Sequence, residues 1–295
     1  MLAMFEVTPR CLMRCPFCYN VWKTPGYPSG EELDLESIKH LAHTAINEFK
    51  VEDVIFSGGE PLLRSDLEHI VEIWKTAGTL RLRLATTGVG LNPALARGLA
   101  SAGINVFMIT LLHTDPAVHD GLFGHSGAFE QASLALANAA AGARAGTVYV
   151  ATRQNRVDFN TYAKLVCALG GEFILINRFI PVAEGEKNRS ALEIPAEDFT
   201  RLLTRAEQCG RQYNLQVSCA LPFNREDTPP RLNALPVVPK CRAGYEKIAI
   251  DFMGNVRPCE QVPAIAGNLL TDPPAKIKKH LRLDAFGKSF TCPSL

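Results

Sequence analysis

The sequence predicts an α/β fold, a partial (β/α)6 TIM-like barrel followed by a small C-terminal domain that bears cysteines. Apolar, strand-like segments alternate with amphipathic, helix-like segments along the chain up to Pro181, and past Pro181 this rhythm breaks, with a proline-rich stretch at 227–240. Repeated strand–helix pairs build a parallel sheet covered by helices, with functional groups at the C-terminal ends of the strands. We therefore assign residues 1–190 to the barrel and residues 191–295 to the small domain.

Each predicted element has its own sequence pattern. Residues 35–49 repeat apolar side chains at helical spacing, whereas residues 80–88 alternate like a strand. The predicted strands are 1–7, 51–59, 80–88, 104–112, 146–152 and 172–180. The predicted helices are 35–49, 66–77, one that opens at Asn92-Pro93, 127–142, 158–169 and 195–212. Residues 245–259 are predicted as a hairpin that turns at Gly254-Asn255.

Composition excludes several classes of protein. A net charge of +1 gives no reason to expect nucleic acid or a membrane surface as a partner, and no apolar run is long enough to cross a bilayer. The chain lacks a secretory signal pattern at its start. Nine cysteines, an odd number bunched towards both ends, fit metal ligation better than a disulfide framework. We expect a cytoplasmic, reducing setting.

Three cysteines near the start, Cys11, Cys15 and Cys18, have the spacing C-x3-C-x2-C. Three thiolates on one loop can hold three irons of a [4Fe–4S] cluster and leave the fourth iron open for chemistry. The alternative is a structural zinc site, which would need a fourth Cys or His ligand. The nearest histidines, His40 and His43, lie in the next predicted helix and are poorly placed to supply it.

A second motif follows the second predicted strand, where Gly58, Gly59, Glu60 and Pro61 form the sequence GGEP. Glycines at a strand end let the backbone approach a ligand closely. The carboxylate of Glu60 can accept hydrogen bonds from an ammonium group. Alone this motif is weak, but one strand after an open-cluster cysteine loop it becomes informative.

Together, CLMRCPFCY and GGEPLLR resemble the radical S-adenosylmethionine (SAM) superfamily. The resemblance implies that the open iron binds SAM, that one-electron reduction cleaves SAM to methionine and a 5′-deoxyadenosyl radical, and that this radical abstracts hydrogen from substrate. It also assigns polar side chains to the SAM site: Tyr19 beside the adenine, Thr87 after the third strand, Thr110 on the fourth and Asn155 after the fifth. Each of these residues has an ordinary packing or capping role as its alternative.

The fourth strand departs from the family pattern, because the usual Ser-Leu-Asp-Gly is replaced by Thr110-Leu111-Leu112-His113. We predict a loop after this strand that carries His113, His119 and His125. At the C-terminal end of a barrel strand, His113 is a candidate proton donor or acceptor for substrate. A structural hydrogen bond is the alternative role.

Cysteines 241 and 259 flank the predicted hairpin, and their surroundings resemble the start of a SPASM or twitch domain. Such domains bind one or two auxiliary iron–sulfur clusters, and we expect a single auxiliary [4Fe–4S] cluster here. Cys241 and Cys259 are its first ligands, Cys292 a third and Cys219 a fourth candidate. Two incidental buried cysteines are the alternative, and Cys167 and Cys209 fall at helical core positions.

The expected function is peptide or protein modification, such as crosslinking or epimerisation of a ribosomal peptide. An alternative is a small molecule substrate in cofactor, tetrapyrrole or natural-product biosynthesis, and a distant one is a non-enzymatic iron–sulfur or zinc protein. A reductant such as flavodoxin or ferredoxin is the expected electron donor. Because the chain begins at its first strand, a peptide substrate would require a separate peptide-recognition protein or a short direct contact.

Overall fold

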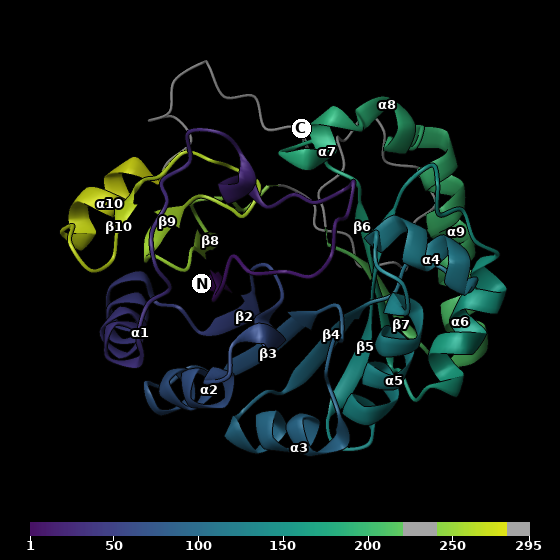
Figure 1. Ribbon diagram of the computed structural model, residues 1–295, viewed down its shortest axis with the longest axis horizontal. Coiled ribbons are helices and arrows are strands. Elements are labelled where there is room, and N and C mark those ends of the chain that lie inside the picture. Colours follow the sequence, from purple (N-terminus) through teal and green to yellow (C-terminus); the bar gives the residue numbers. More distant parts are fainter. Residues whose placement is uncertain (221–240, 282–295) are drawn as a thin grey trace.

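The computed structural model describes residues 1–220 and 241–281, and its centre is one curved sheet of ten strands (Figure 1). The strand order is β10-β9-β8-β1-β2-β3-β4-β5-β6-β7. The strands are β1 (Leu2–Glu6), β2 (Asp53–Ser57), β3 (Arg81–Thr86), β4 (Val106–Thr110), β5 (Arg144–Ala151), β6 (Phe173–Arg178), β7 (Gln216–Cys219), β8 (Lys247–Ile250), β9 (Asn255–Arg257) and β10 (Gly267–Asn268).

Strands β1 to β7 are all parallel, each paired with the next along the chain. The helices that link them are α1 (Leu35–Phe49), α2 (Leu67–Thr76), α3 (Pro93–Ala102), α4 (Pro116–Phe123), α5 (Ala128–Ala140), α6 (Phe159–Ala168), α7 (Glu184–Lys187), α8 (Arg189–Leu192) and α9 (Ala196–Tyr213). Figure 1 shows α1, α2, α3, α5, α6 and α9 in an arc around the outside of the sheet. The predicted partial TIM-like barrel is confirmed.

The C-terminal segment, residues 241–281, extends this sheet at its β1 edge. Strand β8 lies parallel to β1, with Phe5 opposite Ile250. Strand β9 returns antiparallel to β8 through a turn in which Gly254 has a φ of +85°, as the hairpin prediction requires. Strand β10 and helix α10 (Pro274–His280) complete the segment beside α1 (Figure 1). Strand β1 is therefore paired on both sides.

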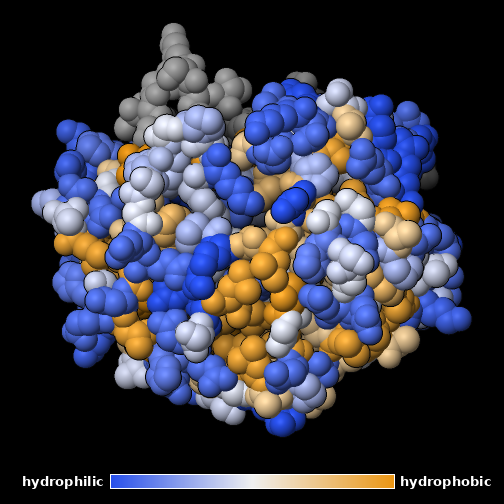
Figure 2. Space-filling model, viewed as in Figure 1, coloured by the Kyte–Doolittle hydropathy of each residue, from blue (hydrophilic) through white to orange (hydrophobic). Residues whose placement is uncertain are grey.

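The two faces of the sheet have different cores. The outer face joins the helices in one large cluster that includes Phe5, Phe56 and Trp74. The inner face carries smaller clusters, one of Met4, Ile55 and Ala249 and another around Met108 and Val148. Figure 2 shows hydrophobic residues gathered near the middle of the face viewed and hydrophilic residues around them.

The sequence prediction of a loop after β4 is wrong, because residues 116–123 form helix α4. Asp115 caps this helix by accepting a hydrogen bond from the N–H of Ala117 at 2.8 Å, and Pro116 occupies its first turn. Gly124 ends the helix with a φ of +58°. The elements α7, α8, α10, β7 and β10 were not predicted. All five are short, so none presents a long periodic pattern.

Candidate active site at the cysteine loop

The cysteine loop, residues 8–20, is joined to the GGEP turn by backbone hydrogen bonds. The N–H of Gly59 donates to the carbonyl oxygen of Thr8, and the N–H of Glu60 donates to that of Arg10, each at 2.7 Å. The pairing of β1 with β2 thus continues beyond both strands. The backbone directly before Cys11 is therefore fixed at the C-terminal edge of the sheet.

The two glycines of this turn are required by close packing. A Cβ atom on Gly58 would lie 2.5 Å from the carbonyl oxygen of Thr8, and one on Gly59 would lie 2.0 Å from that of Arg10. Such distances are far inside van der Waals contact, so any side chain would separate the turn from the cysteine loop. The glycines therefore hold the two motifs together.

Glu60 is fully buried and fastens the turn to the end of β3. One carboxylate oxygen accepts hydrogen bonds from the Thr86 hydroxyl and from the N–H of Leu62. The other accepts from the N–H of Thr87 at 2.8 Å and from the Thr87 hydroxyl. Burial raises the pKa of Glu60, and these hydrogen bonds oppose that rise. All its acceptor positions are in use, so Glu60 connects the ends of two neighbouring strands.

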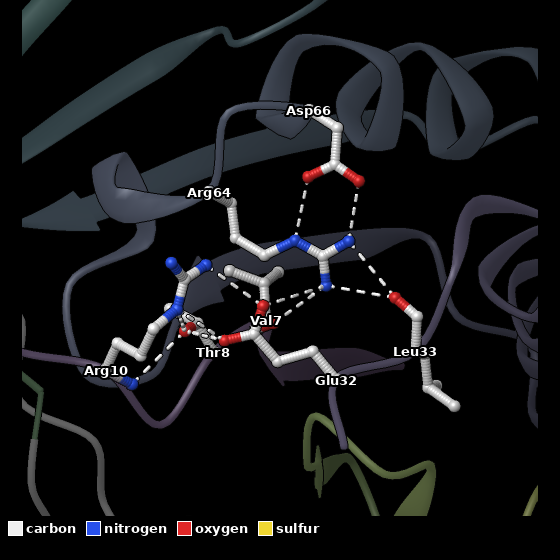
Figure 3. Close-up of polar contacts among 7 residues, drawn as sticks. All are labelled: Val7, Thr8, Arg10, Glu32, Leu33, Arg64 and Asp66. Atoms are coloured by element: carbon white, nitrogen blue, oxygen red, sulfur yellow. Dashed lines mark hydrogen bonds and ion pairs between the residues drawn. The ribbon is translucent and has the colours of Figure 1, made fainter.

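Arg64, three residues beyond the GGEP motif, braces the start of the cysteine loop (Figure 3). Its buried guanidinium donates to the carbonyl oxygens of Val7 and Leu33 at 3.1–3.2 Å and to the carboxylate of Asp66 at 2.7–2.8 Å. The Asp66 hydrogen bonds raise the pKa of Arg64, which stays charged. Sequence reasoning did not single out this residue.

A second carboxylate lies beside this brace. Glu32 accepts from the Thr8 hydroxyl and, at 2.8 and 3.0 Å, from the Arg10 guanidinium (Figure 3). Burial raises the pKa of Glu32, but the hydrogen bonds from Arg10 and Thr8 lower it more. Residues 7 to 10 are consequently held by side chains from two other segments of the chain, Arg64 at Val7 and Glu32 at Thr8 and Arg10.

The segment after β6 holds the other end of the cysteine loop. The N–H of Gly185 donates to the carbonyl oxygen of Cys18 at 3.3 Å, and the Asn188 side chain donates to that of Pro16 at 3.1 Å. The N–H of Arg14 donates to the carbonyl oxygen of Phe123 at the end of α4 at 2.8 Å. Asn188 was also missed from sequence, because nothing in its local pattern indicates a contact 172 residues away.

The three thiols of the loop are free and partly buried. The Nζ of Lys23 lies 3.5 Å from the Sγ of Cys18. Burial raises the pKa of Cys15, and the neighbouring thiols Cys18 and Cys11 raise it further. Positive charge from a metal centre would oppose this rise and favour the thiolate form of Cys15.

The donor set fits a polynuclear cluster better than a single ion. Within residues 1–220 and 241–281, no three His, Cys, Asp or Glu side chains converge as ligands of one metal ion. A [4Fe–4S] cluster needs no such convergence, because each thiolate binds a different iron. Three thiols on a loop fixed at both ends match that requirement.

The next residues of the loop lie towards the GGEP turn. The Asn20 side chain donates to the carbonyl oxygen of Gly58 at 3.0 Å in a buried position. The Tyr19 hydroxyl lies 3.4 Å from the hydroxyl of Ser57 at the end of β2. Burial raises the pKa of Tyr19, which stays protonated. Its predicted place beside adenine stays a prediction.

The remaining predicted polar residues lie at the ends of β4 and β5. Thr110 ends β4, and the Nδ1 of His113 accepts the N–H of Asp115 at 2.9 Å. Asn155 is fully buried, accepts from the N–H of Thr152 at 2.7 Å and donates to the carbonyl oxygen of Val150 at 2.7 Å. This amide shapes the turn after β5. The roles of these residues towards SAM or substrate stay predictions.

His119 lies on α4 against two phenylalanine rings, Phe123 and Phe129, with the Asp120 carboxylate 3.9 Å from its Nδ1. Its ring is fully buried and stacks on Phe123, with 4.7 Å between ring centroids. Burial lowers the pKa of His119 to about 4. It is thus a neutral core residue at physiological pH.

The C-terminal cysteines are only partly assembled within the described residues. Cys241 and Cys259 pack in one small apolar cluster with Ala243, Val262 and Ala264. Cys219 ends β7, at the opposite end of the strand order from β8 and β9, and packs in the main core. Cys292 lies outside the described residues. The structure brings together two of the four predicted auxiliary ligands.

Comparison with known proteins identifies the family. The profile of the radical SAM superfamily matches residues 5–165, more than half of the chain. The chain is 25% identical over 289 residues to an AdoMet-dependent heme synthase of Methanosarcina barkeri, covering 92% of this chain and 80% of that protein. It is 28% identical over 268 residues to a PqqA peptide cyclase of Xanthomonas campestris, covering 90% and 68%. Against a pre-heme d1 synthase of Dinoroseobacter shibae it is 30% identical but spans only 46% of that protein.

Solved structures share the fold at low identity. SuiB of Streptococcus suis, bound to its precursor peptide SuiA, has a TM-score of 0.75 at 14% identity, covering 98% of this chain and 66% of SuiB. The enzyme anSMEcpe with bound AdoMet, which is SAM, has a TM-score of 0.66 at 16% identity, covering 95% and 81%. No helix in the described part of the chain has the length and apolarity needed to cross a membrane. The profile match together with the tethered cysteine loop and GGEP turn shows that this chain belongs to the radical SAM superfamily.

Proposed function

We propose that this chain removes hydrogen from a peptide substrate and thereby modifies it. The observation that carries the peptide substrate is the similarity to PqqA peptide cyclase, which extends over 90% of this chain. This match is long enough to include residues of the C-terminal segment as well as the barrel. The fold shared with the SuiB–SuiA complex supports the same class of substrate.

In this proposal the cysteine loop holds the [4Fe–4S] cluster through Cys11, Cys15 and Cys18. When bound, the cluster and SAM supply the one-electron cleavage of SAM to methionine and 5′-deoxyadenosine, coupled to removal of hydrogen from the substrate. Because every acceptor position of Glu60 is occupied, its proposed role is to fix the strand ends against which SAM lies. Tyr19 and the buried turn around it exclude water from that place.

The chemistry is tested by anaerobic reconstitution of the cluster followed by addition of dithionite and SAM. We expect 5′-deoxyadenosine in the wild type and none in a Cys15→Ala variant. The peptide substrate is tested by incubation with deuterated candidate peptides. Deuterium in the recovered 5′-deoxyadenosine supports the proposal, whereas 5′-deoxyadenosine that never contains deuterium from any peptide counts against it.

A tetrapyrrole is the second candidate substrate, because the heme synthase match covers 92% of this chain and 80% of that protein. The same assay separates the two classes. Deuterium transfer from a labelled porphyrin precursor, with none from peptides, would favour the tetrapyrrole.

We further propose one auxiliary [4Fe–4S] cluster in the C-terminal segment, ligated by Cys241 and Cys259 with Cys292 and Cys219 as further candidates. Its support is the common packing of Cys241 and Cys259 in one small cluster. Reconstituted wild-type protein should contain about four irons more than a Cys241→Ala/Cys259→Ala variant. Equal iron contents would contradict the second cluster.

The proposed electron donor is a small carrier such as flavodoxin or ferredoxin, in a reducing cytoplasm. Arg14 in the cysteine loop and Lys23 just after it are exposed cations, and the thiols of the loop are only partly buried. A cationic rim around a cluster favours a negatively charged carrier. Whether a separate peptide-recognition protein takes part is tested by pull-down with the precursor peptide that yields deuterium transfer.

A further inference from the structure

A buried ion pair joins the first strand of the barrel to the C-terminal hairpin. Glu6 is the last residue of β1 and Arg257 the last residue of β9, and their side chains form this pair at 1% and 0% exposure. The partners are 251 residues apart in sequence. Ala249 of β8 lies opposite both Met4 of β1 and Arg257 of β9, so Arg257 lies across β8 from a residue two positions before Glu6.

Arg257 also closes the turn that follows it. Its Nη1 donates to the carbonyl oxygens of Glu260 at 3.0 Å and Val262 at 3.2 Å. These two carbonyl groups lie in the 258–262 turn, which carries Cys259. One guanidinium thus binds both the barrel strand and the backbone of the turn.

The side chain of Glu260 is held in place by a second link. Glu260 is 6% exposed, and its carboxylate pairs with the Nζ of Lys247 on β8 at 2.6 Å. The turn is therefore linked to β8 through Lys247 and, through Arg257, to the end of β1.

We propose that Arg257, held by Glu6, is a positioning residue that fixes the 258–262 turn, and with it Cys259 and Glu260, against the end of β1. The ligand role of Cys259 rests on the proposed auxiliary cluster, but the position of the turn does not. In physical terms, an Arg257→Met variant leaves the Glu6 charge without its partner and two carbonyl oxygens without their donor. The turn should then open locally while the barrel remains folded.

The test is cysteine labelling of reduced apo protein with iodoacetamide, followed by peptide mapping. Iodoacetamide reaches the buried thiol of Cys259 only when the turn opens. In Arg257→Met the hydrogen bonds that close the turn are lost, so opening becomes more frequent and labelling of Cys259 should accelerate about tenfold. Cys209, fully buried on α9 in the barrel core, is the internal reference and should label at its wild-type rate. Glu6→Gln, which keeps an acceptor for Arg257, should label Cys259 close to the wild-type rate.

Two further variants make the result decisive. Lys278→Met removes an exposed ion pair of the same segment, with Glu48 at 3.2 Å, and should leave both cysteines unchanged. Glu6→Gln/Arg257→Met removes both buried charges, but the carbonyl oxygens of Glu260 and Val262 still lack a donor. Cys259 should therefore still be labelled faster than in the wild type. The proposal is overturned if Cys259 and Cys209 accelerate together in Arg257→Met, or if Cys259 does not accelerate at all. Because no cluster is present, failure of the auxiliary-cluster proposal would leave this result unaffected.

Discussion

Asn188 donates its side-chain amide to the carbonyl oxygen of Pro16 at 3.1 Å and to that of Glu184 at 3.1 Å. One side chain thus connects the segment after β6 to the interior of the C-x3-C-x2-C motif. The loop is anchored to the GGEP turn at its other end, so its thiols sit between two fixed points. This arrangement explains how a loop without secondary structure can present three ligands in a constant geometry.

Replacement of Asn188 by alanine should loosen the cysteine loop. We expect faster amide hydrogen exchange in residues 14–20 and lower iron content after reconstitution, with about 1 kcal/mol lost from the free energy of unfolding. Asn138→Ala is the matched control, because Asn138 also donates to a distant carbonyl oxygen, that of Leu91 at 2.8 Å. It should cost similar stability without affecting exchange in the loop. Equal exchange in the loop for both variants would contradict the anchoring role.

Gly59→Ala should disrupt the site, because its Cβ atom would lie 2.0 Å from the backbone oxygen of Arg10. We expect loss of SAM binding, measured by calorimetry, and incomplete cluster loading. The control is Gly121→Ala in helix α4, where an added Cβ meets nothing within 4 Å. That substitution should raise stability by up to about 1 kcal/mol through helix propensity. A Gly59→Ala protein with normal SAM affinity would show that the close approach is dispensable.

Glu60→Gln should weaken the site although it preserves shape. The carboxylate accepts four hydrogen bonds. In a carboxamide one of the two oxygens is replaced by an NH2 group, which would face two of these donors and could accept from neither. We expect roughly 1–3 kcal/mol lower stability and weaker SAM binding. Thr87→Val, which removes only one hydroxyl donor, should have a smaller effect of the same sign. Urea unfolding and SAM titration measure both, and a Thr87→Val protein more impaired than Glu60→Gln would reverse this ranking.

Arg64→Lys should be costly although it conserves charge. An ammonium group cannot satisfy the Asp66 carboxylate and the carbonyl oxygens of Val7 and Leu33 at once, since it lacks the planar fork of guanidinium. We expect about 2 kcal/mol lower free energy of unfolding. Arg81→Lys, at an arginine whose side chain is 71% exposed and pairs with Asp53, should change stability by less than about 0.5 kcal/mol. Similar losses in both variants would contradict the bracing role of Arg64.

Glu6 should make stability depend on pH. Burial raises the pKa of Glu6 to about 7, even though Arg257 lowers it. A carboxyl that holds its proton more tightly in the folded state stabilises the fold below its unfolded pKa, and this contribution is lost as pH rises through the folded value. Wild-type protein should therefore lose up to roughly 3 kcal/mol relative to Glu6→Gln between about pH 4.5 and about pH 7. Parallel unfolding curves for the two proteins across that range would refute the prediction.

The sequence alone predicted much of the barrel because its signals are local. The buried strand before Cys11 and the capped helix after Asn92 are determined by neighbours in the chain, and both lie where expected. The GGEP turn was recognised for its glycines, but their structural reason, the carbonyl oxygens of Thr8 and Arg10, depends on two strands pairing in register.

The sequence could not indicate contacts between residues that lie far apart in the chain. Asn188, Arg64 and Arg257 are polar residues with no distinctive local pattern, and each becomes important only through a partner brought close by the fold. Helix α4 is a different case, because its cap Asp115 and the following proline were present in the sequence. Three histidines in this segment favour a functional loop, but His119 is a buried core residue of the helix.

The parallel pairing of β8 with β1 has a consequence for biosynthesis. Met4 hydrogen-bonds across to the strand containing Ala249, so one edge of β1 stays open until the ribosome has released most of the described chain. An unpaired strand edge invites association with other chains, and pairing across such a sequence separation is slow. The strand that leads directly into the proposed cluster ligands is thus among the last to be completed. Iron insertion into a nascent chain would meet a cysteine loop whose supporting strand is still half exposed.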